Sequence, residues 1–267
     1  MTRPRIVYVH GAGPQEHRTI LKRRIDGALF GANQLDQSIM AYYGDILNLE
    51  PPIPGPFEAA APEIAELELA FLNRATAVAA ADAANGAPPV DPGGIPGPLE
   101  GVNFPDPVFT VVASIASTDV INYLFHDAGQ QIRDRVSASI PGNEPIVVLA
   151  HSLGTIVAYD VLSERTDLDV RLFLTLGSPL GVGNVQERIG DRSGPPASVP
   201  PNVAAWQNRA DPLDPVALEL TLADEFLPAG FVEDGLVDNE IGLVNHDLIG
   251  YLSTSEIKEL IAAAMTG

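Results

Sequence analysis

The sequence contains no cysteine and almost no lysine. The absence of cysteine among 267 residues excludes disulfides, a thiolate nucleophile and a thiolate zinc site. Lysine occurs only at Lys22 and Lys258, and the formal net charge is −20. Because such an acidic chain repels phosphate groups, we expect neither nucleic acid nor a strongly anionic membrane surface as a partner.

Long hydrophobic runs are also missing. No stretch approaches the roughly 18 apolar residues of a membrane-spanning helix, so we expect no transmembrane segment. The first apolar run, residues 6–9, is too short for a signal-peptide core and ends at His10, so a cytoplasmic location is the default expectation. The length suits one α/β domain over residues 1–267, with the oligomeric state left open.

The hydrophobic pattern predicts a mostly parallel sheet flanked by helices, because a strand–helix–strand order begins near the N-terminus. Expected strands cover 5–9, 38–43, 146–149, 170–176 and 203–207, with 231–237 as a late strand or a hairpin arm. Expected helices cover 15–30, 57–84, most of 108–136, 155–162 and 253–265, and 190–201 is expected to be a loop.

The central stretch is Ala150-His151-Ser152-Leu153-Gly154, which follows a buried strand and precedes a helix. It resembles the nucleophile elbow of α/β-hydrolases, in which a strained backbone lifts the serine hydroxyl clear of the sheet. The small residues Ala150 and Gly154 are expected to approach each other across the turn. Serine–glycine patterns also arise by chance, but the strand before this one and the helix after it favour the elbow.

The first strand runs into His10-Gly11-Ala12-Gly13, which is either a plain glycine-rich turn or an oxyanion loop. With Ser152 present we favour the oxyanion loop. The backbone N–H groups of Ala12 and Leu153 would then stabilise the oxyanion. His10 is expected to brace this loop.

A serine nucleophile needs a histidine base, and His246 is the candidate. It is the only one of the five histidines that follows the elbow by more than one residue. His151, next to the serine, is interpreted as structural and pointing away from the site. No two histidines show metal-ligand spacing, so we expect no metal and no cofactor.

The carboxylate that orients His246 is expected just beyond a strand, between Ser152 and His246. Asp211 and Asp214 both fit this position. We favour Asp211, because the strand over 203–207 would deliver it to the edge of the sheet, and keep Asp214 as the alternative. Each aspartate also directly precedes a proline, and an aspartate in that place is common in ordinary turns without a catalytic role.

Residues 50–110 fit no parallel-strand pattern and are rich in proline and glycine at both ends. We interpret them as a helical cap or lid insertion over the mouth of the site. Its apolar side chains either line an acyl pocket or pack the helices together: Phe57, Leu67, Leu69, Phe71, Leu72, Ile95, Leu99 and Phe104.

Taken together, the motifs resemble the esterase and lipase side of the α/β-hydrolase superfamily. The resemblance rests on five features: residues 10–13, residues 150–154, Leu176-Gly177-Ser178-Pro179, the run from Asp211 to Val216, and His246. It implies a serine hydrolase that cleaves small-molecule or lipid-like carboxylic esters through a Ser–His–Asp triad. The same triad would also act on a lactone, thioester, amide or phospholipid acyl group, and a non-enzymatic scaffold on this fold is the rival outside enzymes.

Overall fold

The computed structural model describes residues 3–34, 36–47, 62–85, 107–193, 198–239 and 245–266. These residues form one parallel six-stranded sheet in the order β2-β1-β3-β4-β5-β6. The strands are β1 (Arg5–Val9), β2 (Ser38–Ala41), β3 (Pro145–His151), β4 (Asp169–Leu176), β5 (Trp206–Ala210) and β6 (Val232–Leu236). The predicted α/β class, with a parallel sheet flanked by helices, is confirmed.

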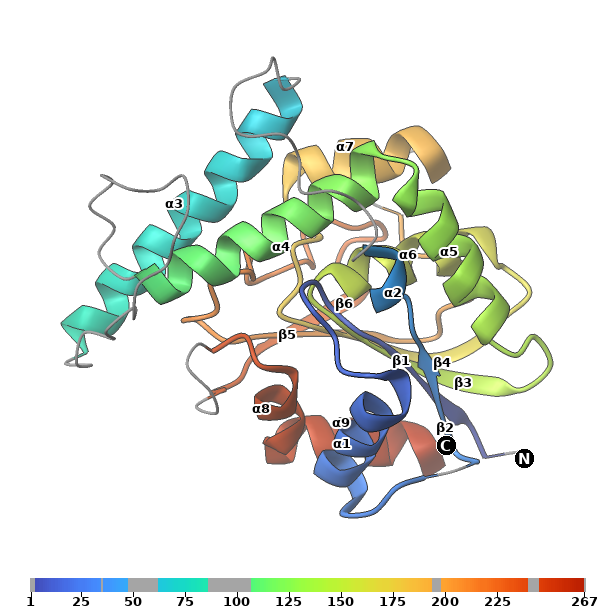
Figure 1. The fold of residues 1–267 in the computed structure, drawn as a ribbon. Coiled ribbons are helices and arrows are strands. Elements are labelled where there is room, and N and C mark those ends of the chain that lie inside the picture. Colours follow the sequence, from blue (N-terminus) through green and yellow to red (C-terminus); the bar gives the residue numbers. More distant parts are fainter. Residues whose placement is uncertain are drawn as a thin grey trace.

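Helices cover both faces of the sheet (Figure 1). On one face lie α1 (Arg18–Phe30), α8 (Leu248–Ser253) and α9 (Ser255–Thr266). On the other lie α2 (Gly44–Leu47), α3 (Pro62–Ala84), α4 (Pro107–Phe125), α5 (Ala128–Ser139), α6 (Leu153–Glu164) and α7 (Gly183–Ser193). Within the described residues, no helix combines the length and apolar character needed to cross a membrane.

The strands read as continuous apolar runs because the sheet is buried on both faces. Side chains alternate between the faces, so Val7 and Val9 of β1 enter the core beneath α4, α5 and α6. Ile6 and Tyr8 enter the opposite core, beneath α1, α8 and α9.

The chain changes direction across the sheet at β1. From β1 it moves to β2 on one side, and it then returns to place β3 on the other side. In open α/β sheets, ligands bind beyond the carboxyl ends of the strands at such a switch point. The segments after β1 and β3 therefore meet where a site is expected.

Several element boundaries differ from those predicted. The expected strand over 203–207 lies later, at β5, and Val203 forms only an isolated bridge with Val170. Helices α7 and α8 were not predicted, and the expected loop over 190–201 begins inside α7. The helical stretch over 108–136 is two helices, α4 and α5, and the segment over 231–237 contains a parallel edge strand, β6.

Within the predicted cap over residues 50–110, the described residues comprise α3 and the start of α4. Helix α3 packs on α4 and α7, at the left of the view in Figure 1. Leu67 and Phe71 are fully buried in the core shared with α4, which favours helix packing over an acyl pocket for these two side chains. Leu69 is 56% exposed. The expected pocket residues Phe57, Ile95, Leu99 and Phe104 lie outside the described residues.

Candidate active site

Ser152 occupies the turn between β3 and α6. Its φ of 55° makes it the one non-glycine residue with positive φ in the described part of the chain. This backbone conformation is unfavourable for L-residues and persists only where the surrounding structure enforces it. Such strain is concentrated at functional sites. The side chain is buried, and Ser152 Oγ has no hydrogen-bond partner among the described residues.

The segment after β1 crosses directly over this turn. A Cβ added to Gly11 would lie 2.7 Å from Ser152 Cβ, so glycine is required at this position. A Cβ added to Gly154 would collide with the carbonyl oxygens of Val9 and His10. Gly154 is therefore small because β1 passes over it, whereas we had expected the constraint to come from Ala150 across the turn.

The two predicted oxyanion donors flank Ser152. Leu153 is the first residue of α6, so its N–H has no partner inside the helix. Ala12 follows Gly11, and its N–H forms no hydrogen bond to any described residue, whereas the N–H of Gly13 binds Asp119 Oδ2 at 2.6 Å. Two free N–H groups beside a serine can stabilise an oxyanion.

His246 forms its carboxylate contact with Asp214. His246 Nδ1 lies 2.8 Å from Asp214 Oδ2, and the histidine side chain is 11% exposed. An Nδ1–H that donates to this carboxylate leaves Nε2 free to accept a proton. The pair sits beside the serine turn, because Ser152 N donates to Leu176 O and a Cβ on the next residue, Gly177, would lie 3.2 Å from His246 Nδ1.

Asp214 is fully buried and accepts four hydrogen bonds. Its Oδ1 accepts from the N–H groups of Val216 and Ala217, and its Oδ2 accepts from His246 and from the Tyr251 hydroxyl at 2.6 Å. Burial acts to raise the pKa of Asp214, but the adjacent imidazole, the tyrosine hydroxyl and a backbone N–H outweigh it and hold the pKa below its ordinary value. The carboxylate is therefore ionised and held in one orientation.

Asp211, the carboxylate that we favoured from the sequence, has other partners. Its Oδ1 accepts from Leu213 N, and its Oδ2 accepts from Asn239 N and Asn245 Nδ2. Strand β5 ends at Ala210 instead of at 207, so Asp211 turns back toward the segment before His246. The structure thus gives Asp214 the contact with His246 and gives Asp211 the task of holding the segment that carries this histidine.

Tyr251 and Gly177 complete the surroundings of this pair. Tyr251 lies on α8, which was not predicted, and its hydroxyl also accepts from Asp211 N at 3.0 Å. Gly177 has a φ of 53°, and a Cβ added there would lie 2.5 Å from Asp214 Oδ2. The glycine of the Leu-Gly-Ser-Pro motif thus leaves room for the carboxylate.

We expect Gly177→Ala to lower kcat by about 10²-fold, because the new methyl group displaces Asp214 from His246. The positive φ adds a loss of about 1–3 kcal/mol in the free energy of unfolding. Gly27→Ala is the matched control: nothing lies within 4 Å of a Cβ there, on helix α1. That variant should keep full activity and gain about 0.5–1 kcal/mol of stability. Equal activity of the two variants would contradict the steric argument.

His151 packs against His246 instead of pointing away from the site. The two ring centroids are 4.5 Å apart. Burial, reinforced by the neighbouring His246, lowers the pKa of His151 to about 3. The ring is therefore neutral near pH 7 and adds no charge that would oppose a proton on His246.

His10 braces the segment after β1, as expected from the sequence. Its Nε2 accepts from Tyr43 N at 3.1 Å, so its Nδ1 carries the proton and donates to Gly11 O at 2.9 Å. The ring also stacks on Tyr43, with centroids 4.0 Å apart. Burial lowers the pKa of His10 from 6.5 to about 4.

This buried histidine predicts a loss of stability in acid. A pKa that is lower in the folded state means that the unfolded chain binds more protons, so stability is complete above pH 6.5 and falls as the pH approaches 4. The full loss from His10 is about 3 kcal/mol. Urea unfolding at several pH values should show a shallower pH dependence for His10→Gln than for the wild type. Parallel curves would contradict the assignment of His10 as a buried neutral base.

Comparisons with protein-family models, with curated proteins and with solved structures find no match to this chain. In addition, no group of three His, Asp or Glu side chains in the described ranges could hold a metal ion. The functional interpretation therefore depends on the motifs and on the geometry above.

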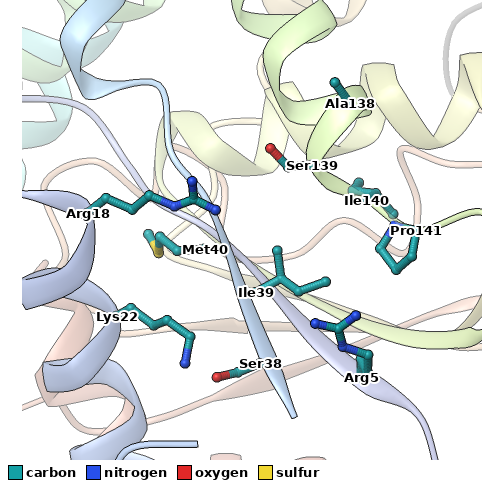
Figure 2. Close-up of a pocket in the computed structure, with 10 residues that line it drawn as sticks. All are labelled: Arg5, Arg18, Lys22, Ser38, Ile39, Met40, Ala138, Ser139, Ile140 and Pro141. Atoms are coloured by element: carbon teal, nitrogen blue, oxygen red, sulfur yellow. The ribbon is translucent and has the colours of Figure 1, made fainter. Parts of the chain in front are cut away.

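A hollow of about 510 Å³ runs along β2 at the open edge of the sheet (Figure 2). Its lining includes Arg5, Arg18 and Lys22, and Figure 2 shows Arg18 and Lys22 on one side of Ile39 and Arg5 on the other. Arg5 pairs with a glutamate and Lys22 with an aspartate, so Arg18 is the one lining cation without an ion pair to a described residue. Cations that do not converge and are largely neutralised do not form an anion site.

Proposed function

We propose that this protein is a serine hydrolase of the α/β-hydrolase type that cleaves carboxylic esters through an acyl-enzyme. The observation that carries the proposal is a positive-φ serine at a strand–helix turn beside a His246–Asp214 pair whose carboxylate is buried. The position at the switch point of a parallel sheet supports it. The hydrolase fold and the lid role of residues 50–110 are part of the same proposal.

In the proposed mechanism, His246 Nε2 removes the proton of Ser152 Oγ as the oxygen attacks the ester carbonyl. The negative charge on the carbonyl oxygen is stabilised by the N–H groups of Leu153 and Ala12. His246 then returns its proton to the leaving alcohol, and the serine is left acylated. Water, deprotonated by the same nitrogen, hydrolyses the acyl-enzyme and restores Ser152.

Asp214 acts on His246 throughout these steps. The ionised carboxylate keeps the proton of the resting histidine on Nδ1 and stabilises the imidazolium that forms during attack. The neutral His151 ring beside it adds no opposing charge. This reaction needs no metal or cofactor, and its partner is a small-molecule or lipid-like ester.

A fluorophosphonate probe, which phosphonylates activated serines, tests the nucleophile directly. We expect labelling at Ser152, located by peptide mass spectrometry, and turnover of p-nitrophenyl esters in a series from acetate to palmitate. Labelling without turnover of any ester would redirect the substrate to a lactone, thioester or amide. A protein that the probe does not label at Ser152 would be the non-enzymatic scaffold, and the proposal would fail.

A further inference from the structure

Two helices outside the sheet reach into opposite sides of the candidate site. Arg74 on α3 donates from Nε to Asp214 O at 3.1 Å and from Nη2 to Pro212 O at 2.8 Å. Asp119 on α4 accepts from Gly13 N at 2.6 Å, in the segment after β1. Both contacts hold backbone groups at or next to residues of the proposed mechanism. Both side chains come from helices, not from strands of the sheet.

The two helices form one packed unit. Leu67, Phe71 and Ala75 of α3 are buried in the same core as Phe109, Ala113, Ala116 and Val120 of α4. Figure 1 shows the helices side by side over the sheet. The segments that they hold follow β1 and β5, which are separated in the sheet by β3 and β4. A contact between α3 and α4 therefore links two segments that the sheet keeps apart.

The charged groups of Arg74 and Asp119 are well suited to holding these two backbone segments. The guanidinium of Arg74 provides two N–H groups in a fixed geometry for two carbonyl oxygens of one turn. The Asp119 carboxylate accepts from the N–H of Gly13, whereas the N–H of Ala12, one residue earlier, has no partner among the described residues. Bonds in which one partner is charged are stronger than neutral ones, so each contact restricts its segment.

We infer that α3 and α4 act together as a brace that fixes the distance between the oxyanion segment and the turn that carries Asp214. Arg74 and Asp119 are then positioning residues of the reaction. This inference rests on the proposed function for its catalytic consequence, but the mechanical coupling is independent of it. Helix α3, which lies in the stretch predicted only as a cover of the site, would thus be part of its frame.

Hydrogen–deuterium exchange measures the coupling without any substrate. We expect Arg74→Met to raise exchange at least tenfold in residues 208–217 and also in residues 10–16, because the brace transmits the loss. Asp119→Ala should affect the same two segments, whereas Asp119→Asn, which retains an acceptor for Gly13 N, should not. Arg171→Met, at an exposed arginine paired with Asp169, is the matched control and should change neither segment.

The kinetic readout separates positioning from simple destabilisation. We expect Arg74→Met to lower kcat by about 10- to 100-fold, with KM within about threefold, because misplacement of reacting groups acts on the chemical step. Arg74→Lys, which keeps the charge and can donate one bond, should recover most of kcat.

The brace is overturned if each variant loosens only its own segment, or if neither variant changes exchange. Unchanged kcat in Arg74→Met would overturn the positioning role. If the wild type is not labelled at Ser152, the proposed function fails, and the exchange experiment still decides whether the brace exists.

Discussion

Ser152→Ala is expected to lower kcat for ester hydrolysis by about 10⁶-fold, since the loss of a triad nucleophile has an effect of that size in a related mechanism. No other described hydroxyl is presented at a strained turn beside the His246–Asp214 pair. Residual turnover would reflect the oxyanion donors and substrate binding alone. The measurement is steady-state hydrolysis of a short p-nitrophenyl ester, with the fluorophosphonate label as an independent count of active sites.

The fold should survive this substitution. Ser152 Oγ is buried and has no partner among the described residues, so alanine removes a desolvated hydroxyl without breaking a hydrogen bond. The melting temperature is therefore expected to be unchanged or slightly higher.

Ser178→Ala is the matched control at another buried serine. That hydroxyl bonds with Thr155 Oγ1 at 2.8 Å and with Leu180 N at 3.1 Å. Its loss should cost about 1–2 kcal/mol of stability and leave most of kcat. Wild-type turnover in Ser152→Ala would exclude the serine mechanism.

The sequence was sufficient to predict the serine turn and the parallel sheet, because both depend on local patterns. The apolar run of β3, Ser152 and the start of α6 are contiguous in the chain. The small residues at the turn were also visible in the sequence, but the contacts that require them to be small were not. Gly154 is constrained by Val9 and His10, which lie more than 140 positions earlier.

Strand β5 was misplaced because its polar residues obscure the hydrophobic pattern. Asn208 and Arg209 are buried within the strand, where apolar residues were expected. Their partners come from distant segments: Asn208 binds Asp234 and Leu220 O, and Arg209 donates to Glu233 O. Periodicity cannot anticipate such long-range compensation, so the strand was predicted three residues too early.

That displacement also explains the preference for Asp211 over Asp214. Both aspartates lie in one turn and both are buried. The contact that separates them is with His246, 32 residues later, and no local pattern encodes it. Tyr251 was missed for the same reason, because its hydroxyl reaches both aspartates from a helix near the C-terminus.

Asp214→Asn is expected to lower kcat by about 10⁴-fold, and the hydrogen bonds of this residue explain why. Two backbone N–H groups require an acceptor at Oδ1, so the amide oxygen of the asparagine must take that position. Its NH₂ group then faces His246 Nδ1, which must become an acceptor. The histidine proton moves to Nε2, and the nitrogen that should deprotonate Ser152 can no longer do so.

Asp211→Asn provides the comparison. Its Oδ2 accepts from two N–H groups and its Oδ1 from one, so the amide oxygen of the asparagine takes the Oδ2 position and its NH₂ group faces Leu213 N, which loses its acceptor. We expect a loss of about 1–3 kcal/mol in the free energy of unfolding. The fall in kcat should be at least tenfold smaller than for Asp214→Asn, because His246 keeps its carboxylate and its tautomer.

Measuring kcat and urea unfolding for both variants decides between the two aspartates. The reverse order of kcat would make Asp211 the partner of the base during turnover, and the contact between His246 and Asp214 would then describe only the resting enzyme.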